Sequence, residues 1–155
     1  MSAEEEHGDL LLAEQACFAL YSASRAVTDV YRPLLAKLGL TYPQYLVLLV
    51  LWEDEPRSVK RIAEALLLDY GTVSPLLKRL ETRGLVARRR SEEDERTVTV
   101  GLTDEGWALR REVLEVPATI GCAMGLGADE RRELIATLRT LTASTLAFDP
   151  EEGED

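Results

Sequence analysis

The chain has 155 residues, of which 46% are hydrophobic and 30% charged, and its formal net charge at pH 7 is −10. This length and composition are typical of a folded protein with one core. Every apolar run is shorter than the roughly 18 residues of a membrane-spanning helix, and the acidic N-terminus does not resemble a signal peptide, so we expect a cytoplasmic protein without a membrane partner. Two cysteines and one histidine, His7, argue against a metal site, a cofactor and histidine-based catalysis.

The first part of the chain is expected to be helical. Residues 1–8 form an acidic tail, and residues 9–38 carry the first dimerisation helix described below. From Leu10 to about Tyr31, apolar residues recur at helical spacing, with Cys17 on the apolar face. Pro33 is expected to loosen this helix. Residues 38–40 then end it.

Three further helices are predicted between residues 41 and 84. Thr41 is a candidate N-cap for a buried helix that contains residues 45–52. Ser58 is a candidate N-cap for a helix over residues 59–67. Residues 69–71 read as a turn, and the next helix is expected to start near residue 71 or 72. Gly84 is expected to end it.

Beyond Gly84 the period changes from helical to alternating. Residues 86–102 are predicted to form a two-stranded hairpin with a charged tip at residues 91–96. Thr103 is a candidate N-cap for a helix that Pro117 interrupts. Gly121, Gly125 and Gly127 predict loosened backbone around Cys122. A last amphipathic helix over residues 129–146 precedes an acidic tail, residues 148–155.

The charge is distributed unevenly along the chain. Residues 57–90 contain nine basic and three acidic residues, so this segment carries about +6 and the remainder about −16. A basic segment in an acidic chain is an electrostatic feature that suits nucleic acid. A solvated basic face with no partner is the alternative that charge alone leaves open.

Two short helices followed by a hairpin give the order of a winged helix-turn-helix, a mainly α fold with a small β-hairpin wing. The second helix, within residues 58–84, has an apolar face and a polar face, as a helix that docks on a core and enters a major groove requires. An ordinary amphipathic helix remains the alternative. The candidate DNA-binding residues are Thr72, Ser74, Lys78 and Arg79 on that helix, and Arg88, Arg90, Asp94 and Arg96 on the wing.

The residues resemble the MarR family of transcription regulators. Asp94-Glu95-Arg96 and residues 102–106 resemble the wing signature of that family, and residues 77–86 resemble its recognition helix. The match is stronger to its organic hydroperoxide resistance regulators (OhrR type), through residues 17–21, 41–45 and 91–96. The resemblance covers about residues 9–147.

This resemblance implies a homodimer, built from helices over about residues 9–38 and 104–147, that binds a pseudo-palindromic DNA operator. It implies that Cys17 is the sensor of organic hydroperoxides and that Tyr31 and Tyr42 hydrogen-bond its sulfur. It also implies, for the two-cysteine subgroup, that Cys122 of the other subunit captures oxidised Cys17 in a disulfide.

The residues themselves constrain the redox hypothesis. A thiolate attacks a peroxide, and hydroxyl donors such as those of Tyr21, Tyr31 and Tyr42 favour the thiolate. Tyr21 lies one helical turn from Cys17, but Tyr31 lies about 21 Å away along a continuous helix. Tyr31 therefore requires the partner helix to reach a Cys17. A buried, inert cysteine and plain tyrosine packing are the alternatives.

Three other functions compete with this one. A repressor of the MarR type that binds a small aromatic ligand needs no cysteine chemistry. A thiol peroxidase has no need of a basic wing, and an architectural DNA-binding protein has no need of a cysteine and tyrosines. We therefore expect a regulator and not an enzyme.

Overall fold

The fold is that of a computed structural model, which describes residues 10–149. The predicted tail at residues 1–8, with His7, lies outside the described residues, as do residues 150–155 of the predicted C-terminal tail. The chain divides into two compact units, Met1–Ile120 and Gly121–Asp155. Each unit is described by itself.

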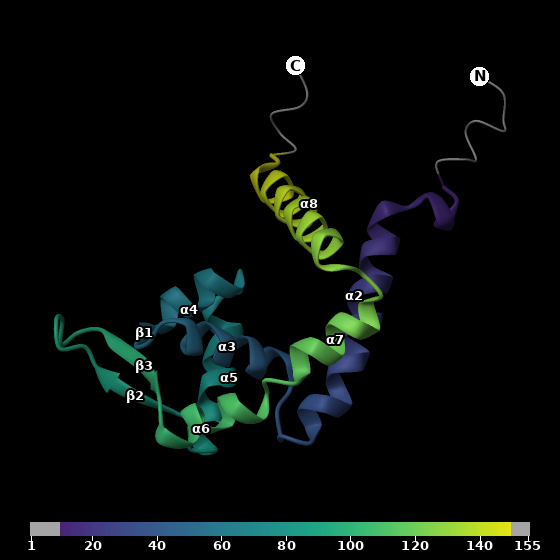
Figure 1. Cartoon of the computed structure of the whole chain (residues 1–155). Coiled ribbons are helices and arrows are strands. Elements are labelled where there is room, and N and C mark those ends of the chain that lie inside the picture. The colour runs from purple at the N-terminus through teal and green to yellow at the C-terminus, as the bar shows by residue number, and fades with distance from the viewer. Residues whose placement is uncertain (1–9, 150–155) are drawn as a thin grey trace, which may run out of the picture. The chain divides into compact units, whose positions relative to one another are not determined.

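The first unit is mainly helical with a small sheet (Figure 1), which agrees with the predicted fold class. Its elements, with the helix that crosses into the second unit, are η1 (Leu12–Glu14), α2 (Ala16–Ala36), α3 (Tyr42–Glu53), β1 (Arg57–Ser58), α4 (Val59–Leu66), α5 (Tyr70–Thr82), β2 (Val86–Arg90), β3 (Val98–Leu102), α6 (Asp104–Glu112) and α7 (Val116–Met124).

Helix α2 begins later than the sequence suggested and continues past Pro33. Residues 12–14 form a separate 3-10 turn, and the α-helix starts at Ala16. Pro33 lies inside the helix, which continues to Ala36. A proline removes one backbone donor, here the one that would reach the carbonyl of Asp29. This loss falls in the last turns of a 21-residue helix, where it does not end the helix.

Helix α3 is the centre of the core. The Thr41 hydroxyl accepts a hydrogen bond from the backbone N–H of Gln44, and the Gln44 side chain accepts one from the backbone N–H of Thr41. This capping box confirms the predicted start of the helix. Val47, Leu48 and Leu51 are completely buried, as the apolar run predicted.

Helices α4 and α5 form the helix-turn-helix. The Ser58 hydroxyl accepts a hydrogen bond from the Arg61 N–H, which confirms the predicted cap. Helix α5 starts at Tyr70, earlier than the predicted residue 71 or 72, because the Asp69 carboxylate accepts a hydrogen bond from the Thr72 N–H at 2.8 Å. Gly84 follows α5 with φ of +73°, as expected for a helix C-terminus.

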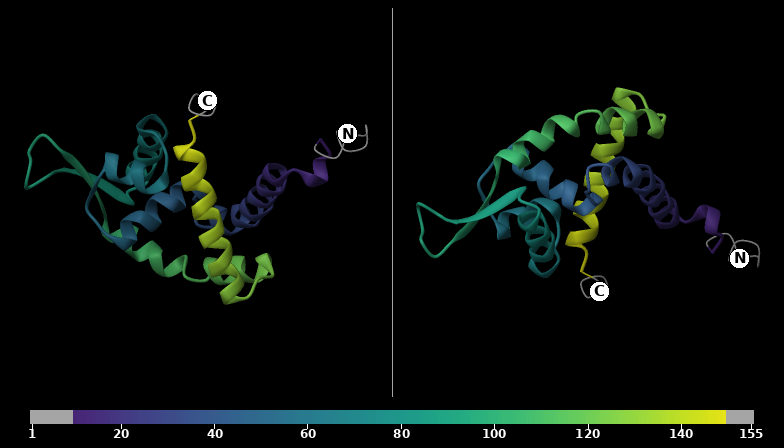
Figure 2. Two further views of the ribbon diagram at one scale, coloured as in Figure 1. Left: turned by 90° about the horizontal axis from the view of Figure 1, so that it is seen from above. Right: turned by 90° about the horizontal axis from the view of Figure 1, so that it is seen from below.

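The sheet contains one strand more than predicted. Strands β2 and β3 pair antiparallel, with Arg88 opposite Val100, and the hairpin extends beyond the neighbouring helices in all three views (Figures 1 and 2). Strand β1 pairs with the other edge of β3, so the order is β1-β3-β2. Two residues beside a proline give no alternating pattern, which explains why β1 was missed.

Side chains from α3 and its exit attach the sheet to α6. The Trp52 indole donates a hydrogen bond to the Gly106 carbonyl at 3.0 Å. The Glu55 carboxylate accepts hydrogen bonds from the Leu102 N–H and from the Trp107 indole. The Thr103 hydroxyl caps α6 by accepting a hydrogen bond from the Gly106 N–H, as predicted. These bonds hold the base of the wing on the core.

The backbone around Cys122 differs from the prediction. Helix α6 already ends at Glu112, and Pro117 lies in the first turn of α7. Helix α7 continues through Gly121 and Cys122 to Met124, so the predicted loosened stretch around Cys122 is wrong. A single glycine is tolerated within a helix. The chain turns only at Gly125, where φ is +65°.

The second unit contains the end of α7 and helix α8 (Ala128–Ala147), which confirms the predicted last helix. The Arg131 guanidinium donates a hydrogen bond to the Leu126 carbonyl at 2.8 Å and fixes the turn between the two helices. Across the part of the chain that the structure describes, every helix is too short or too polar to cross a membrane.

The close approach of α6 to the sheet predicts a severe effect for Gly106→Ala. A Cβ atom at Gly106 would lie 2.1 Å from the Leu85 carbonyl oxygen, so the backbone must shift. We expect the free energy of unfolding, measured by urea titration, to fall by about 1–3 kcal/mol or more. Gly84→Asn is the control, because asparagine tolerates a positive φ and the space there is open. Equal unfolding midpoints for the two variants would contradict this packing.

Candidate DNA interface and thiol site

Helix α5 has the two faces that the sequence predicted. Val73, Leu77 and Leu80 are completely buried against the core. On the opposite side Lys78 and Arg79 are exposed, and Ser74, another candidate, is partly buried. The basic side chains are therefore free to approach a polyanion, whereas the apolar ones fix the helix on α3 and α4.

Thr72 has a structural role in addition to the predicted one. Its hydroxyl donates a hydrogen bond to the Asp69 carboxylate at 2.9 Å, and its backbone N–H donates to the same group. These two bonds lower the pKa of Asp69 below its ordinary value. The hydroxyl oxygen of Thr72 keeps its capacity to accept a hydrogen bond, but its donor is used within the protein.

A groove of about 530 Å³ lies beside the basic face of α5. It is lined by Gln44, Pro75, Lys78, Arg79, Thr82 and Arg83. The Arg83 guanidinium donates hydrogen bonds to the carbonyls of Leu38 and Gly39, so it ties the end of α5 to the loop between α2 and α3. Sequence reasoning did not single out Arg83, because spacing does not reveal a contact across 44 residues.

All four candidate residues of the wing are exposed, and two of them, Arg88 and Asp94, also have a side-chain partner within the protein. Arg90 and Arg96 are exposed. The Arg88 guanidinium lies 3.5 Å from the Glu81 carboxylate. Asp94 accepts hydrogen bonds from the Arg96 N–H and the Thr97 hydroxyl, so it shapes the wing tip. A carboxylate with this role organises the loop and repels phosphate.

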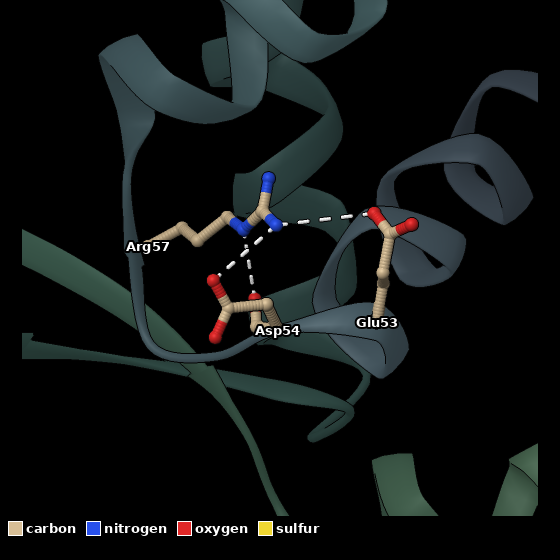
Figure 3. A network of polar contacts seen from close by, with 3 residues as sticks. All are labelled: Glu53, Asp54 and Arg57. Carbon is tan, nitrogen blue, oxygen red and sulfur yellow. Dashed lines mark hydrogen bonds and ion pairs between the residues drawn. The ribbon is translucent and has the colours of Figure 1, made fainter.

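Part of the positive charge is paired within the protein. Figure 3 shows the Arg57 guanidinium between two carboxylates, 3.8 Å from Glu53 and 3.4 Å from Asp54. Its Nε also donates a hydrogen bond to the Asp54 carbonyl at 2.9 Å. Arg57 therefore anchors the start of β1, and the charge available at a DNA surface lies further along the chain.

The two cysteines occupy different units. Cys17 lies in the first turn of α2 in the first unit, and Cys122 lies in the last turn of α7 in the second. Both are free and exposed. Tyr31 lies 14 residues beyond Cys17 on the same continuous helix, so the two residues are about 21 Å apart along it.

Tyrosines from α2 and α3 form one cluster. The rings of Tyr31 and Tyr42 are 4.7 Å apart, and the Tyr45 ring lies 5.8 Å from Tyr31 and 6.4 Å from Tyr42. Tyr31 and Tyr42 are partly buried, and Tyr45 is 2% exposed. The sequence placed Tyr45 in the core helix only. Its position three residues after Tyr42, on the same helical face, was the signal for the cluster.

Burial keeps these phenols protonated to a higher pH than an exposed tyrosine. It raises the pKa of Tyr31 to about 12, and the phenols of Tyr42 and Tyr45 add to that shift. Burial also raises the pKa of Tyr42 and of Tyr45 above their ordinary value. A phenol that stays neutral at physiological pH remains a hydrogen-bond donor, which is the form that stabilises an anion.

Tyr21 lies apart from this cluster. Its side chain is 59% exposed, and the Arg25 guanidinium lies 5.4 Å from its ring centre. The structure thus groups Tyr31 and Tyr42 with Tyr45 and leaves the predicted role of Tyr21 as a prediction.

Two helices leave apolar side chains uncovered. In α2 only Leu35 is buried, while Phe18 and Leu20 are exposed. Within the described residues of α8 all side chains are at least partly exposed, including Ile135 and Leu141. Apolar surface of this kind favours association with another protein surface.

The fold and its basic helix define a winged helix-turn-helix DNA-binding protein, and comparisons with known proteins identify its family. Residues 29–113 match the model of the SarA/Rot transcriptional regulators. The organic hydroperoxide resistance transcriptional regulator of Bacillus subtilis is 46% identical over 138 residues, which are 89% of this chain and 94% of that protein.

Two solved structures add to this identification. AbfR of Staphylococcus epidermidis, in reduced form on DNA, is 35% identical with a TM-score of 0.75 over 91% of this chain and 99% of its own. The same protein is also known in a disulfide form. Bordetella bronchiseptica BpsR, regulated by 6-hydroxynicotinic acid, is 28% identical with a TM-score of 0.78 over 85% of this chain and 96% of its own.

The chain belongs to the MarR/SarA family of winged-helix transcriptional regulators. The predicted resemblance and the predicted class, a DNA-binding regulator and not an enzyme, are confirmed by this membership. The assignment to a two-cysteine subgroup stays a prediction.

The tyrosine cluster predicts an unusual alkaline titration. We expect one phenol to ionise near pH 12, because burial and its two neighbours disfavour the tyrosinate of Tyr31. The contribution of this group to stability is complete below pH 10 and is lost as the pH rises toward 12. Absorbance at 295 nm measures the ionisation. Tyr31→Phe should remove the last step, and an unchanged curve in that variant would refute the assignment.

Arg57 is paired with carboxylates within the protein, whereas Lys78 is exposed, and this contrast predicts which of the two residues contacts DNA. Lys78→Ala should weaken DNA binding and reduce the slope of log affinity against log salt by about two, because a dimer loses two phosphate contacts. Arg57→Ala, the control, removes the same charge from a residue already paired with Glu53 and Asp54, and its slope should match wild type. Fluorescence anisotropy across a salt series measures both. Indistinguishable slopes for the two variants would contradict this interface.

Proposed function

We propose that the protein is a homodimeric transcriptional repressor that binds a pseudo-palindromic operator when reduced and leaves it when an organic hydroperoxide oxidises Cys17. The observation that carries the proposal is that one unbroken helix, α2, carries an exposed Cys17 and, further along, Tyr31, which belongs to a cluster of neutral phenols with Tyr42 of α3. The hydroperoxide regulator of Bacillus subtilis and the redox forms of AbfR support it.

The sensor site requires two chains. About 21 Å separates Cys17 from Tyr31 along α2, so this cysteine does not meet its own cluster. An antiparallel α2 from a second chain brings Tyr31 and Tyr42 of that chain beside Cys17. The exposed apolar side chains of α2 and α8 supply the surface for such a dimer.

The chemistry is that of a thiolate. The phenols donate hydrogen bonds to the Cys17 thiolate, which attacks the outer oxygen of a hydroperoxide. The oxygen–oxygen bond breaks, Cys17 becomes a sulfenic acid, and the alkoxide takes a proton and leaves as an alcohol. Aromatic rings and apolar helix faces around the thiolate favour hydroperoxides with apolar groups over hydrogen peroxide.

Cys122 of the partner completes the reaction in this proposal. Its thiol condenses with the sulfenic acid, forms a disulfide and releases water. A disulfide requires Cα atoms within about 7 Å. If the reduced protein holds the two cysteines farther apart, the bond moves α7 and changes the spacing of the two DNA-reading lobes. Support for this role rests on the exposure of Cys122, since its helix is regular.

A second candidate function is a repressor that responds to a small aromatic acid without cysteine chemistry. The observation that favours it is the similarity to BpsR, whose DNA binding 6-hydroxynicotinic acid regulates. Under this function the tyrosine cluster would pack against a ligand ring and not against a thiolate.

Operator binding before and after cumene hydroperoxide separates the two functions. Gel shifts with a duplex from upstream of the protein's own gene should show loss of binding for wild type and full binding for Cys17→Ser. Cys122→Ser should form no dimer-sized band on a non-reducing gel and should keep more operator binding than wild type after oxidation, because the disulfide that moves α7 cannot form. Added dithiothreitol should restore wild-type binding, because it reduces the disulfide.

Wild-type binding that survives the peroxide would overturn the redox proposal while leaving the DNA-binding fold in place. Loss of binding upon addition of 6-hydroxynicotinic acid, equal in wild type and Cys17→Ser, would establish the ligand-responsive repressor.

A further inference from the structure

Tyr70 is the first residue of the reading helix α5, and its side chain is 60% exposed. The chain has five tyrosines, of which three form the cluster of α2 and α3, and Tyr21 contacts Arg25. A large aromatic side chain with this exposure leaves much apolar area in water. Its place at the start of the helix is where recognition helices reach base edges.

The neighbouring groups decide what this end of α5 can approach. The Asp69 carboxylate caps the helix and is ionised at neutral pH, and the hydrogen bonds from Thr72 lower its pKa further below that pH. An anion at this position disfavours a backbone phosphate. The positive charge of Lys78 and Arg79 lies two turns further along α5. The first turn of α5 is thus suited to the base edges in the DNA major groove, and the later turns are suited to the phosphate backbone beside it.

We propose that Tyr70 is a specificity-determining residue whose ring packs against the C5-methyl group of a thymine in each operator half-site. This inference rests on the proposed function as a DNA-binding dimer and adds the base that the first turn of α5 reads.

The chemistry selects thymine over the other bases. In the major groove thymine alone presents a methyl group, and apolar side chains contact it. Asp69 and the Thr72 donor are engaged with each other, so the exposed group of this turn offers mainly an apolar ring. Burying one methyl group in such a contact corresponds to about a four-fold change in affinity.

The test begins with the reduced full-length protein and a random duplex library. Wild type should select one fixed thymine per half-site that Tyr70→Ala does not select. In the selected duplex each thymine is then replaced by deoxyuridine, which lacks only the methyl group, and affinity is measured by anisotropy. Replacement of the fixed thymine in one half-site should weaken wild-type binding about four-fold and leave Tyr70→Ala unaffected.

Two further variants keep the assignment specific. Tyr70→Phe retains the ring and should show the wild-type loss with deoxyuridine. Leu67→Asn removes an exposed apolar side chain in the connection between α4 and α5, where φ is +54° and asparagine is tolerated; it should also keep the thymine preference.

The outcomes are distinguishable. Equal deoxyuridine losses for wild type and Tyr70→Ala would overturn the inference and leave the repressor function standing. A loss of the thymine preference in Leu67→Asn but not in Tyr70→Ala would assign the contact to Leu67 and overturn it as well. A wild-type protein that selects no duplex would overturn the proposed function itself.

Discussion

The unbroken length of helix α2 is the constraint on which the account of this protein depends. It runs from Ala16 to Ala36 and carries Cys17 at one end and Tyr31 near the other. A rigid helix fixes the distance between them at about 21 Å. A site that uses both residues must therefore use two chains, and dimerisation becomes part of the chemistry.

Helix α3 links the tyrosine cluster to the DNA-reading elements. It supplies Tyr42 and Tyr45, and Tyr45 also packs edge-on against Trp52 at 6.5 Å. Trp52 bonds to α6, and Glu55 just beyond holds the wing base. Arg83 joins the end of α5 to the loop that precedes α3. A close-packed interior transmits displacements, so a change at Tyr42 has a direct path to α5 and the wing.

The sequence predicted the elements that depend on local chemistry. Thr41, Ser58 and Thr103 each cap the helix that they were expected to cap. Hydroxyl caps and helical periodicity act within a few residues, which is why a sequence shows them directly. The family resemblance supplied the functional class.

Contacts between residues that are far apart in the chain could not be predicted from the sequence. Strand β1 exists because β3 pairs with it, Arg88 meets Glu81 across the turn, and Tyr45 joins a cluster that spans two helices. The prediction of loosened backbone around Cys122 was wrong because two of the three glycines lie beyond helix α7. The turn that contains them is fixed by the hydrogen bond from Arg131. Glycine composition alone did not reveal that bond.

Heterodimers of complementary variants test the central claim most directly. A dimer of one Cys17→Ser chain and one Tyr31→Phe chain holds an intact Cys17 opposite an intact Tyr31 only if the site is shared between chains. The rate of Cys17 oxidation by cumene hydroperoxide, followed by sulfenic acid trapping, should equal that of one wild-type site. A rate equal to that of the Tyr31→Phe homodimer would contradict a site shared between two chains.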